Sequence, residues 1–325
     1  MPMLRVAILD DYQQVALAMA DWSRLGPDVE VVALPHHLGD VETAASALAE
    51  FDVLVMMRER MPVPRALIER LPRLRYMVFT GSHNTVIDLA AAAERGIPIS
   101  RTAMRASPSA AEITWALIMA WMRHIPQEHA AMRAGGWQTT VGMNLHGKTL
   151  GLLGLGTLGS VVARYGKAFD MNVIAWSPNL TPERAAAQGV TAVSREDLFR
   201  QADILSIHLK LGPRSTGVVG AAEFELMKPS ALLVNTSRGP IVDEAAMLAA
   251  LKQNSIGGAA LDVFDQEPLP ADHPLRKLDN VLLTPHLGYV TDESYKGFFA
   301  SAVENIAAWR AGQPINLYEA GLRSA

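Results

Sequence analysis

Short apolar runs alternate with alanine-rich, helix-like segments along the whole chain. This alternation predicts βαβ units and parallel sheets. In the first third, helix-like stretches at Asp40–Glu50 and Val86–Arg95 separate the apolar runs. The runs predict a small doubly wound domain of five strands, at Leu4–Leu9, Val29–Leu34, Asp52–Met57, Leu74–Phe79 and Ile97–Ile99.

A second group of six runs predicts a second doubly wound domain. Its strands are expected at Thr149–Leu155, Asn172–Trp176, Asp203–Leu209, Ala231–Thr236, Gly258–Phe264 and Val281–Thr284. Three helix starts fall between these runs, with capping residues Thr181, Ser194 and Asp243. A last helix is expected over Asp292–Arg310.

A long helical stretch, roughly Ser107–Arg133, separates the two groups. It is apolar on more than one side, with Trp115, Ile118 and Trp121 among its side chains. A helix of this kind is buried between domains or covered by a second subunit. We expect both to hold here.

Composition narrows the class of protein. The 325 residues suggest about two domains at ~150 residues each. A net charge of −4 argues against a nucleic-acid binder with a basic face. The chain has no cysteine, which excludes disulfides, Cys-based zinc or iron–sulfur sites and a Cys nucleophile. The start of the chain does not fit a signal peptide, and the apolar stretch near Ala116–Met122 is too short to span a bilayer. We therefore expect a cytoplasmic protein without membrane or nucleic-acid partners.

A glycine-rich segment between a predicted strand and a helical run fits the pattern G-x-G-x-x-G. Its glycines are Gly154, Gly156 and Gly159. In a dinucleotide-binding turn the first glycine permits the tight turn, the second lets the backbone approach a pyrophosphate, and the third lets helix pack on strand. The phosphates then lie at the helix N-terminus. The context favours a dinucleotide site over a turn that binds nothing.

The acidic residue that usually holds the ribose 2′-hydroxyl is missing about 20 residues further on. Ser177 stands in its place, and the nearest arginine is Arg184. Without the carboxylate, a 2′-phosphate meets no repulsion. The sequence therefore allows either NAD or NADP.

A second glycine pattern, Gly142–Thr149, matches the P-loop G-x-x-x-x-G-K-[ST]. A P-loop needs a strand before it and a helix after it. Here a strand is expected to follow instead, so we reject a nucleoside triphosphatase.

Three ionisable residues follow consecutive predicted strands of the second domain, namely Arg238, Glu267 and His286. The C-terminal ends of parallel strands lie along one edge of the sheet, where ligands bind. Histidine can move a proton near neutral pH, a carboxylate beside it stabilises the imidazolium, and arginine offers a fork for a substrate carboxylate. Together with a nicotinamide, this set predicts hydride transfer at a carbon next to a carboxylate.

At these residues the chain resembles the D-isomer-specific 2-hydroxyacid dehydrogenase family. The resemblance covers nearly the whole chain and is carried by the stretches LHGKTLGLLGLGTLG, LVNTSRGPIVDEAAMLAAL, GGAALDVFDQEPLP and NVLLTPHLGY. It implies a Rossmann cofactor domain at residues 103–291, inserted into a flavodoxin-like substrate domain at residues 1–102 and 292–325. It also implies a homodimer formed through the cofactor domain.

The resemblance assigns roles residue by residue. The family's catalytic Arg, Glu and His fall on Arg238, Glu267 and His286, and its carboxamide-binding Asp falls on Asp262. Its further cofactor contacts fall on Thr157, Leu158, Ser177, Leu209, Thr236 and Gly288.

The family's carboxylate-binding loop in the substrate domain falls on residues 80–84, with Gly81, Ser82 and His83 as contacts. His83 stands where a second glycine is common, which restricts the backbone there. Its imidazole either reaches the substrate or points to solvent. Arg58 either lines the same cleft or lies at the surface. Trp137 either reaches a neighbouring subunit's pocket or is buried in its own subunit.

The leading functional hypothesis is an NAD(P)-dependent reductase of small 2-keto acids, of the glyoxylate or hydroxypyruvate type. One alternative is phosphoglycerate oxidation. Another is a dinucleotide-sensing binding protein without turnover. Formate oxidation is disfavoured, because formate dehydrogenases of this superfamily carry Gln at the position of Glu267.

Overall fold

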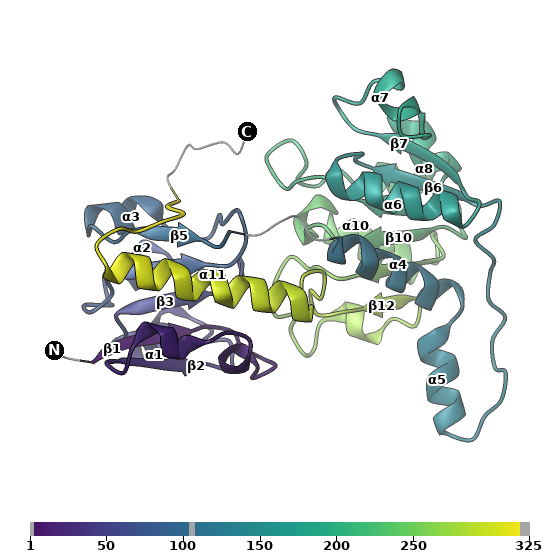
Figure 1. Cartoon of the computed structure of the whole chain (residues 1–325). Helices are drawn as coiled ribbons and strands as arrows, with labels where there is room; N and C mark the ends of the chain where they lie inside the picture. Colours follow the sequence, from purple (N-terminus) through teal and green to yellow (C-terminus); the bar gives the residue numbers. More distant parts are fainter. Residues whose placement is uncertain (1–2, 104–107, 319–325) are drawn as a thin grey trace. The chain divides into compact units, whose positions relative to one another are not determined.

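The computed structural model describes residues 3–103 and 108–318. The chain divides into two compact units, one formed by Met1–Ala106 with Thr291–Ala325 and the other by Ser107–Val290 (Figure 1). The first unit is therefore discontinuous in sequence. Each unit is built on its own parallel sheet.

The sheet of the first unit has five parallel strands in the order β2-β1-β3-β4-β5, which is the flavodoxin-like order. The strands are β1 Leu4–Ile8, β2 Val29–Ala33, β3 Val53–Met56, β4 Tyr76–Phe79 and β5 Ile99–Arg101. The central strands β3 and β4 are buried along their whole length. A strand covered on both faces reads as a continuous apolar run, which is why the runs stood out in the sequence.

Helices cover this sheet on both faces. One core contains side chains of α1, α2 and α3 packed on the strands. The closing helix α11 begins after the Thr291 cap and contacts β4 and η2. The helices are η1 Ala16–Ala18, η2 Trp22–Leu25, α1 Val41–Leu48, α2 Arg65–Ile68, α3 Leu89–Glu94 and α11 Asp292–Arg310.

The sheet of the second unit has seven parallel strands in the order β12-β11-β10-β9-β6-β7-β8. The strands are β6 Thr149–Leu153, β7 Asn172–Trp176, β8 Thr191–Ala192, β9 Ile204–Ile207, β10 Leu232–Asn235, β11 Gly258–Leu261 and β12 Val281–Leu283. The strand order reverses between β6 and β9, and the glycine-rich turn follows β6 directly. In doubly wound folds the ligand crevice lies at such a switch point.

Two apolar cores, one on each face, hold this sheet. Helices α8, α9 and α10 contribute to one core, and α4 and α6 contribute to the other. The helices are α4 Ser109–Met122, α5 Ile125–Arg133, α6 Thr157–Ala168, α7 Pro182–Ala186, α8 Arg195–Gln201, α9 Ala221–Leu226, α10 Glu244–Lys252, η3 Gly239–Ile241 and η4 Pro274–Lys277. The predicted caps at Thr181, Ser194 and Asp243 are confirmed, since each side chain accepts an N–H of the first helical turn.

The prediction of one long helix over Ser107–Arg133 is wrong. Ser107 lies outside the described residues, and two helices, α4 and α5, meet at His124, whose φ of 50° is left-handed. Pro126 explains the break, because it lacks an N–H and its ring cannot continue a preceding helix.

The prediction of six strands in the second unit is also wrong. The seventh strand, β8, has two residues and is too short to leave a pattern. Most predicted strands extend one to three residues too far, into the loops that carry the candidate site residues. Among the described residues, no helix is both long and apolar enough to cross a membrane.

Candidate active site

Three candidate side chains lie in the loops that follow neighbouring strands of the second unit. Arg238 follows β10, Glu267 follows β11 and His286 follows β12. The structure brings Glu267 and His286 into direct contact, with Nδ1 of His286 2.6 Å from Oε2 of Glu267. Arg238 is near enough for its charge to lower the pKa of Glu267.

Glu267 is held in its ionised form. Its other oxygen, Oε1, accepts the N–H of Phe264 at 2.9 Å. Burial by itself raises the pKa of this carboxyl, but the hydrogen bond and charge of His286, the Phe264 N–H and the charge of Arg238 outweigh burial. The pKa of Glu267 therefore lies below its usual value, and the ionised carboxylate accepts a hydrogen bond from the Nδ1–H of His286.

His286 has a restrained backbone and a restrained ring. Its φ of 53° is left-handed, a conformation that a residue with a Cβ rarely adopts. The ring lies edge-on to Tyr289, with centroids 5.3 Å apart. Within the described residues nothing bonds to Nε2 of His286, so this nitrogen can meet a ligand. Tyr289 lies three residues after His286, and sequence reasoning missed it because nothing in the sequence tells which way its ring turns.

Asp262 holds the turn that carries His286. Its side chain is fully buried and accepts the hydroxyl of Thr284 at 2.6 Å and the N–H groups of Leu287 and Gly288 at 2.7 and 2.9 Å. Burial raises the pKa of Asp262, and these donors with the charge of His286 oppose the rise. The carboxylate of Asp262, the predicted carboxamide-binding residue, therefore accepts three hydrogen bonds from the 284–288 turn.

Arg238 is positioned through its backbone. The carbonyl of Arg238 accepts Nδ2 of Asn235 at 2.9 Å, and Nη1 donates to the carbonyl of Ser237 at 2.7 Å. The next residue, Gly239, packs so tightly that a Cβ there would lie 2.1 Å from the backbone of Phe264. The backbones of the loops after β10 and β11 are therefore in close contact, and this contact fixes the position of the Arg238 backbone.

The glycine-rich turn fits a phosphate group. A Cβ at Gly154 would lie 2.8 Å from the carbonyl oxygen of His208, and one at Gly159 would lie 2.2 Å from the carbonyl oxygen of Gly154. A Cβ at Gly156 would meet only open space. The described part of the chain offers no acceptor to the N–H groups of Thr157, Leu158 and Gly159, and α6 has no capping side chain. Unsatisfied N–H groups at a helix N-terminus are what a pyrophosphate requires.

The remaining predicted cofactor residues lie in the same unit as this turn. Ser177 follows β7 and is partly exposed, and its carbonyl accepts the N–H of Leu180. Leu209 follows β9, and its carbonyl accepts the hydroxyl of Ser237. Thr236 follows β10 and shares a 2.7 Å hydrogen bond with Thr114. These residues, with Gly288, follow strands of one sheet at its C-terminal edge.

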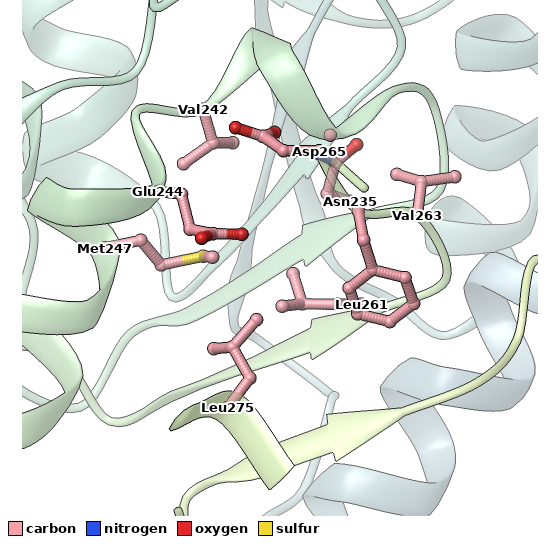
Figure 2. Close-up of a pocket in the computed structure, with 10 residues that line it drawn as sticks. Asn235, Val242, Glu244, Met247, Leu261, Val263, Asp265 and Leu275 are labelled. Carbon is pink, nitrogen blue, oxygen red and sulfur yellow. The ribbon is translucent and has the colours of Figure 1, made fainter. Parts of the chain in front are cut away.

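A small cavity opens next to this edge, between β10, β11 and α10 (Figure 2). Its volume is about 10 Å³, and the side chains of Asn235, Glu244 and Asp265 are among its lining. Burial and the nearby charges of Glu244 and Asp243 raise the pKa of Asp265. The cavity is the size of one water molecule, so it is not the substrate site.

The predicted carboxylate-binding loop lies in the first unit, after β4. Gly81 has a φ of 96°, and its N–H donates to Oγ1 of Thr102 at 2.8 Å. Among the described residues, no acceptor takes the N–H groups of Ser82 and His83. The imidazole of His83 is exposed, and its Nδ1 lies 3.1 Å from the hydroxyl of Tyr318.

Arg58 lies against this loop rather than on the open surface. A Cβ added at Gly81 would lie 2.0 Å from Nη1 of Arg58. Arg58 has a left-handed φ of 56°, its N–H donates to Thr80, and its carbonyl accepts Nδ2 of Asn84. The guanidinium is therefore held over the backbone of Gly81, and a bulkier residue at position 81 would displace it.

Two other sequence features are decided by the structure. Trp137 is 73% exposed, so it is not buried in its own subunit. The P-loop pattern at Gly142–Thr149 runs into β6 and not into a helix, which agrees with its rejection.

No group of three or more His, Asp or Glu side chains in the described ranges could hold a metal ion.

Comparison with known proteins identifies the relatives of this chain. Residues 115–288 match the family model described as "D-isomer specific 2-hydroxyacid dehydrogenase, NAD binding domain". A glyoxylate reductase of Aeropyrum pernix is 39% identical over 287 residues, covering 85% of each chain. A D-3-phosphoglycerate dehydrogenase of Methanocaldococcus jannaschii is 38% identical over 288 residues, which is 85% of this chain but only 55% of that protein. The chain thus spans about half the length of this relative.

A solved structure agrees with these sequence relatives. A crystal structure from Ralstonia solanacearum, described as "putative D-3-phosphoglycerate dehydrogenase oxidoreductase", superimposes with a TM-score of 0.90 at 38% identity, over 97% of this chain and 96% of the other.

Proposed function

Because the chain belongs to the D-isomer specific 2-hydroxyacid dehydrogenase family, we propose that it interconverts a small 2-keto acid and the corresponding D-2-hydroxy acid with a nicotinamide dinucleotide, as a reductase of the glyoxylate or hydroxypyruvate type. The observation that carries this proposal is the 2.6 Å contact between His286 and Glu267 on the sheet edge that also holds the glycine-rich turn.

His286 is the proposed acid and base. Glu267 engages Nδ1, which leaves Nε2 to face the substrate. During reduction Nε2 gives a proton to the keto oxygen, and during oxidation it takes the proton from the alcohol. Glu267 stabilises the protonated ring and fixes its orientation. When bound, the nicotinamide supplies the hydride in one direction and accepts it in the other.

Arg238 is the proposed partner of the substrate carboxylate. Its guanidinium can form two parallel hydrogen bonds with a carboxylate, which sets orientation as well as affinity. In the first unit, the N–H groups of Ser82 and His83 are proposed as further donors, with Gly81 providing the turn. The N–H of Gly81 is excluded from this role because it already donates to Thr102.

The cofactor is proposed to be NAD or NADP, held at Gly154, Gly156 and Gly159 and at the first turn of α6. The open space at Gly156 and the unsatisfied N–H groups there support this placement. Family correspondence adds Thr157, Leu158, Ser177, Leu209, Thr236, Asp262 and Gly288 as contacts. Ser177 leaves both dinucleotides possible because it neither repels a 2′-phosphate nor supplies the usual carboxylate.

The test is the absorbance of reduced nicotinamide. NADH and NADPH are each combined with glyoxylate, hydroxypyruvate, pyruvate and phenylpyruvate. We expect turnover with at least one keto acid. A protein that binds a dinucleotide but turns over none of them contradicts the proposal and favours a sensor.

Phosphoglycerate oxidation is the second candidate. Relatives named D-3-phosphoglycerate dehydrogenase support it, and so does the guanidinium of Arg58 beside the loop at Gly81, because a cation there suits a second anionic group. Oxidation of 3-phosphoglycerate with NAD⁺ or NADP⁺ distinguishes this candidate. Turnover there, with none for glyoxylate or hydroxypyruvate, would replace the first proposal.

A cytoplasmic homodimer is proposed as the working form. The absence of cysteine suits a reducing compartment. Helix α5 has no buried residue, and Ile125, Met132, Trp137 and Val141 are exposed apolar side chains on α5 and the segment after it. Such a surface is usually covered by another protein. Light scattering coupled to size exclusion tests this, and a monomer at micromolar concentration would contradict it.

A further inference from the structure

A hollow of about 440 Å³ lies on the first unit, and none of the residues assigned above lines it. Its lining includes Arg75, Arg95 and Trp309. The hollow is an open depression of the surface, so it can hold a small organic molecule on one side only. It is also far larger than the water-sized cavity beside β10 and β11.

The hollow lies at the N-terminal edge of the five-stranded sheet. Arg75 immediately precedes β4 and Pro98 immediately precedes β5, and both line it. The carboxylate-binding loop at residues 80–84 follows β4 and so lies at the C-terminal edge. Because the strands are parallel, the two places are at opposite ends of the same sheet. The hollow is therefore separate from the proposed substrate contacts of this unit.

Two arginines bring uncompensated positive charge to the hollow. Within the described residues, neither Arg75 nor Arg95 has a carboxylate at ion-pairing distance, although Arg95 donates to the carbonyl of Ile68. Their neighbours differ, since Arg73 pairs with Asp52 and Arg70 pairs with Glu42. Two exposed guanidinium groups with no carboxylate at ion-pairing distance in the described part of the chain favour an anionic ligand.

Trp309 holds one of these arginines in place. Its ring stacks on that of Tyr76, with centroids 4.8 Å apart and 5° between planes. The guanidinium carbon of Arg75 lies 5.4 Å from the centroid of the Trp309 ring. A cation on an aromatic face loses little further freedom when it binds an anion. The remaining lining comes from Gly96, Gly312 and four apolar residues, of which Pro98 and Pro314 are partly exposed and Leu74 and Ile97 are buried.

We propose that this hollow is a second binding site, for a small aromatic carboxylate. The carboxylate pairs with Arg75 and with the remaining N–H groups of Arg95. The ring lies on the apolar surface formed by Pro98 and Pro314. This site is independent of the proposed dehydrogenase activity, because it contains none of the proposed catalytic residues.

The test is isothermal titration calorimetry of the full chain at constant ionic strength, with 1-naphthoate as the probe. We expect one saturable site per chain. Arg75→Gln should weaken binding roughly tenfold or more, since a charge-assisted hydrogen bond contributes on that scale. Arg95→Gln should weaken it less. Arg70→Gln is the matched control, because it removes an arginine paired elsewhere and should leave binding unchanged.

Two further ligands and one further variant distinguish this site from an ionic site without aromatic selectivity, from an apolar site and from the active site. The neutral naphthalene-1-carboxamide should bind at least tenfold more weakly, and inorganic phosphate should not displace 1-naphthoate. Equal binding of the amide would overturn the ionic part of the proposal, and displacement by phosphate would overturn the aromatic part. Binding that survives in Arg75→Gln but is lost in Arg238→Gln would place the ligand at the proposed active site and overturn the second site.

Discussion

The carboxylate of Glu267 bridges the imidazole of His286 and the backbone of Phe264, with 2.6 Å to Nδ1 and 2.9 Å to the amide nitrogen. The two side chains are 19 residues apart and come from the loops after β11 and β12. This contact orients the ring and dedicates Nδ1 to the carboxylate, so any acid–base chemistry must use Nε2.

Replacing His286 with Ala should lower kcat by roughly 10² to 10⁴-fold, the usual contribution of general acid–base catalysis. Cofactor affinity should stay nearly unchanged, because the phosphate-binding turn lies at α6. Steady-state rates and cofactor titration by fluorescence measure the two effects. Glu267→Gln should also lower kcat, since the amide cannot stabilise an imidazolium as a carboxylate does. Near-normal turnover in His286→Ala would show that the assigned acid–base group is wrong.

Replacing Arg238 with Ala should raise KM for the keto acid and lower kcat. Loss of a two-point, charge-assisted contact should cost roughly 10²-fold or more in kcat/KM. Arg238→Lys keeps the charge but not the fork, so it should recover only part of the loss. Kinetics over a range of keto-acid concentrations separate the two parameters. An unchanged KM in Arg238→Ala would argue that Arg238 does not bind the substrate.

Replacing Asp262 with Asn should destabilise the second unit and displace His286. The amide accepts through one oxygen only, so its NH2 group faces either the N–H of Gly288 or the two donors of Thr284 and Leu287, which then lose their acceptor. We expect the free energy of unfolding to fall by about 2 kcal/mol, the scale of one unsatisfied buried group. Urea unfolding measures it, with Asp265→Asn as the control, because neutralising Asp265 removes repulsion from Glu244 and Asp243. Equal stability of the two variants would contradict the proposed role of Asp262.

Replacing Ser177 with Asp should shift dinucleotide preference toward NADH. A carboxylate after β7 accepts the ribose hydroxyls and repels a 2′-phosphate. We expect the ratio of NADPH to NADH dissociation constants to rise roughly tenfold or more, as like charges oppose binding. Asn172→Asp is the control, because it adds the same charge at the opposite end of β7. A similar shift in both variants would mean that Ser177 does not contact the ribose.

Replacing Asp203 with Asn should destabilise the protein in a pH-dependent way. Its carboxylate accepts Nζ of Lys228 and the N–H of Thr149, each at 2.8 Å. Burial raises the pKa of Asp203, but these partners outweigh burial and hold the pKa below its usual value. A lowered folded-state pKa gives stability above the unfolded pKa of about 3.9, and this stability is lost as pH falls through the folded value.

The free energy of unfolding of Asp203→Asn should therefore lie about 1 kcal/mol or less below wild type at pH 7, since solvent screens the pair. The difference should shrink as pH falls below about 4 and vanish once the carboxyl is protonated in both the folded and the unfolded state. Urea titrations at several pH values measure it. If the difference in unfolding free energy between Asp203→Asn and wild type grew as pH fell, the lowered pKa of Asp203 would be contradicted.

Several features followed from the sequence because they depend on local patterns. Apolar runs predicted the strands of both sheets, and Thr181, Ser194 and Asp243 predicted helix starts, since capping is a contact within one turn. The placement of Arg238, Glu267 and His286 after neighbouring strands followed from the topology of parallel sheets. The break at His124 could have been predicted from Pro126. The strand β8 could not, because two residues are too few to show an apolar run or an alternation of apolar and polar positions.

Other relationships exist only in the folded chain, because they join residues far apart in sequence. Asp262 could be aligned with a cofactor contact, but its three hydrogen bonds to the 284–288 turn depend on how β11 and β12 pair. Arg58 could be read as a surface residue until the fold placed its guanidinium against Gly81. Arg75 and Trp309 are more than two hundred residues apart, and only packing of α11 on the sheet brings them together. Local chemistry determined which groups this protein can use, and the pairing of distant strands and helices decided which of them meet.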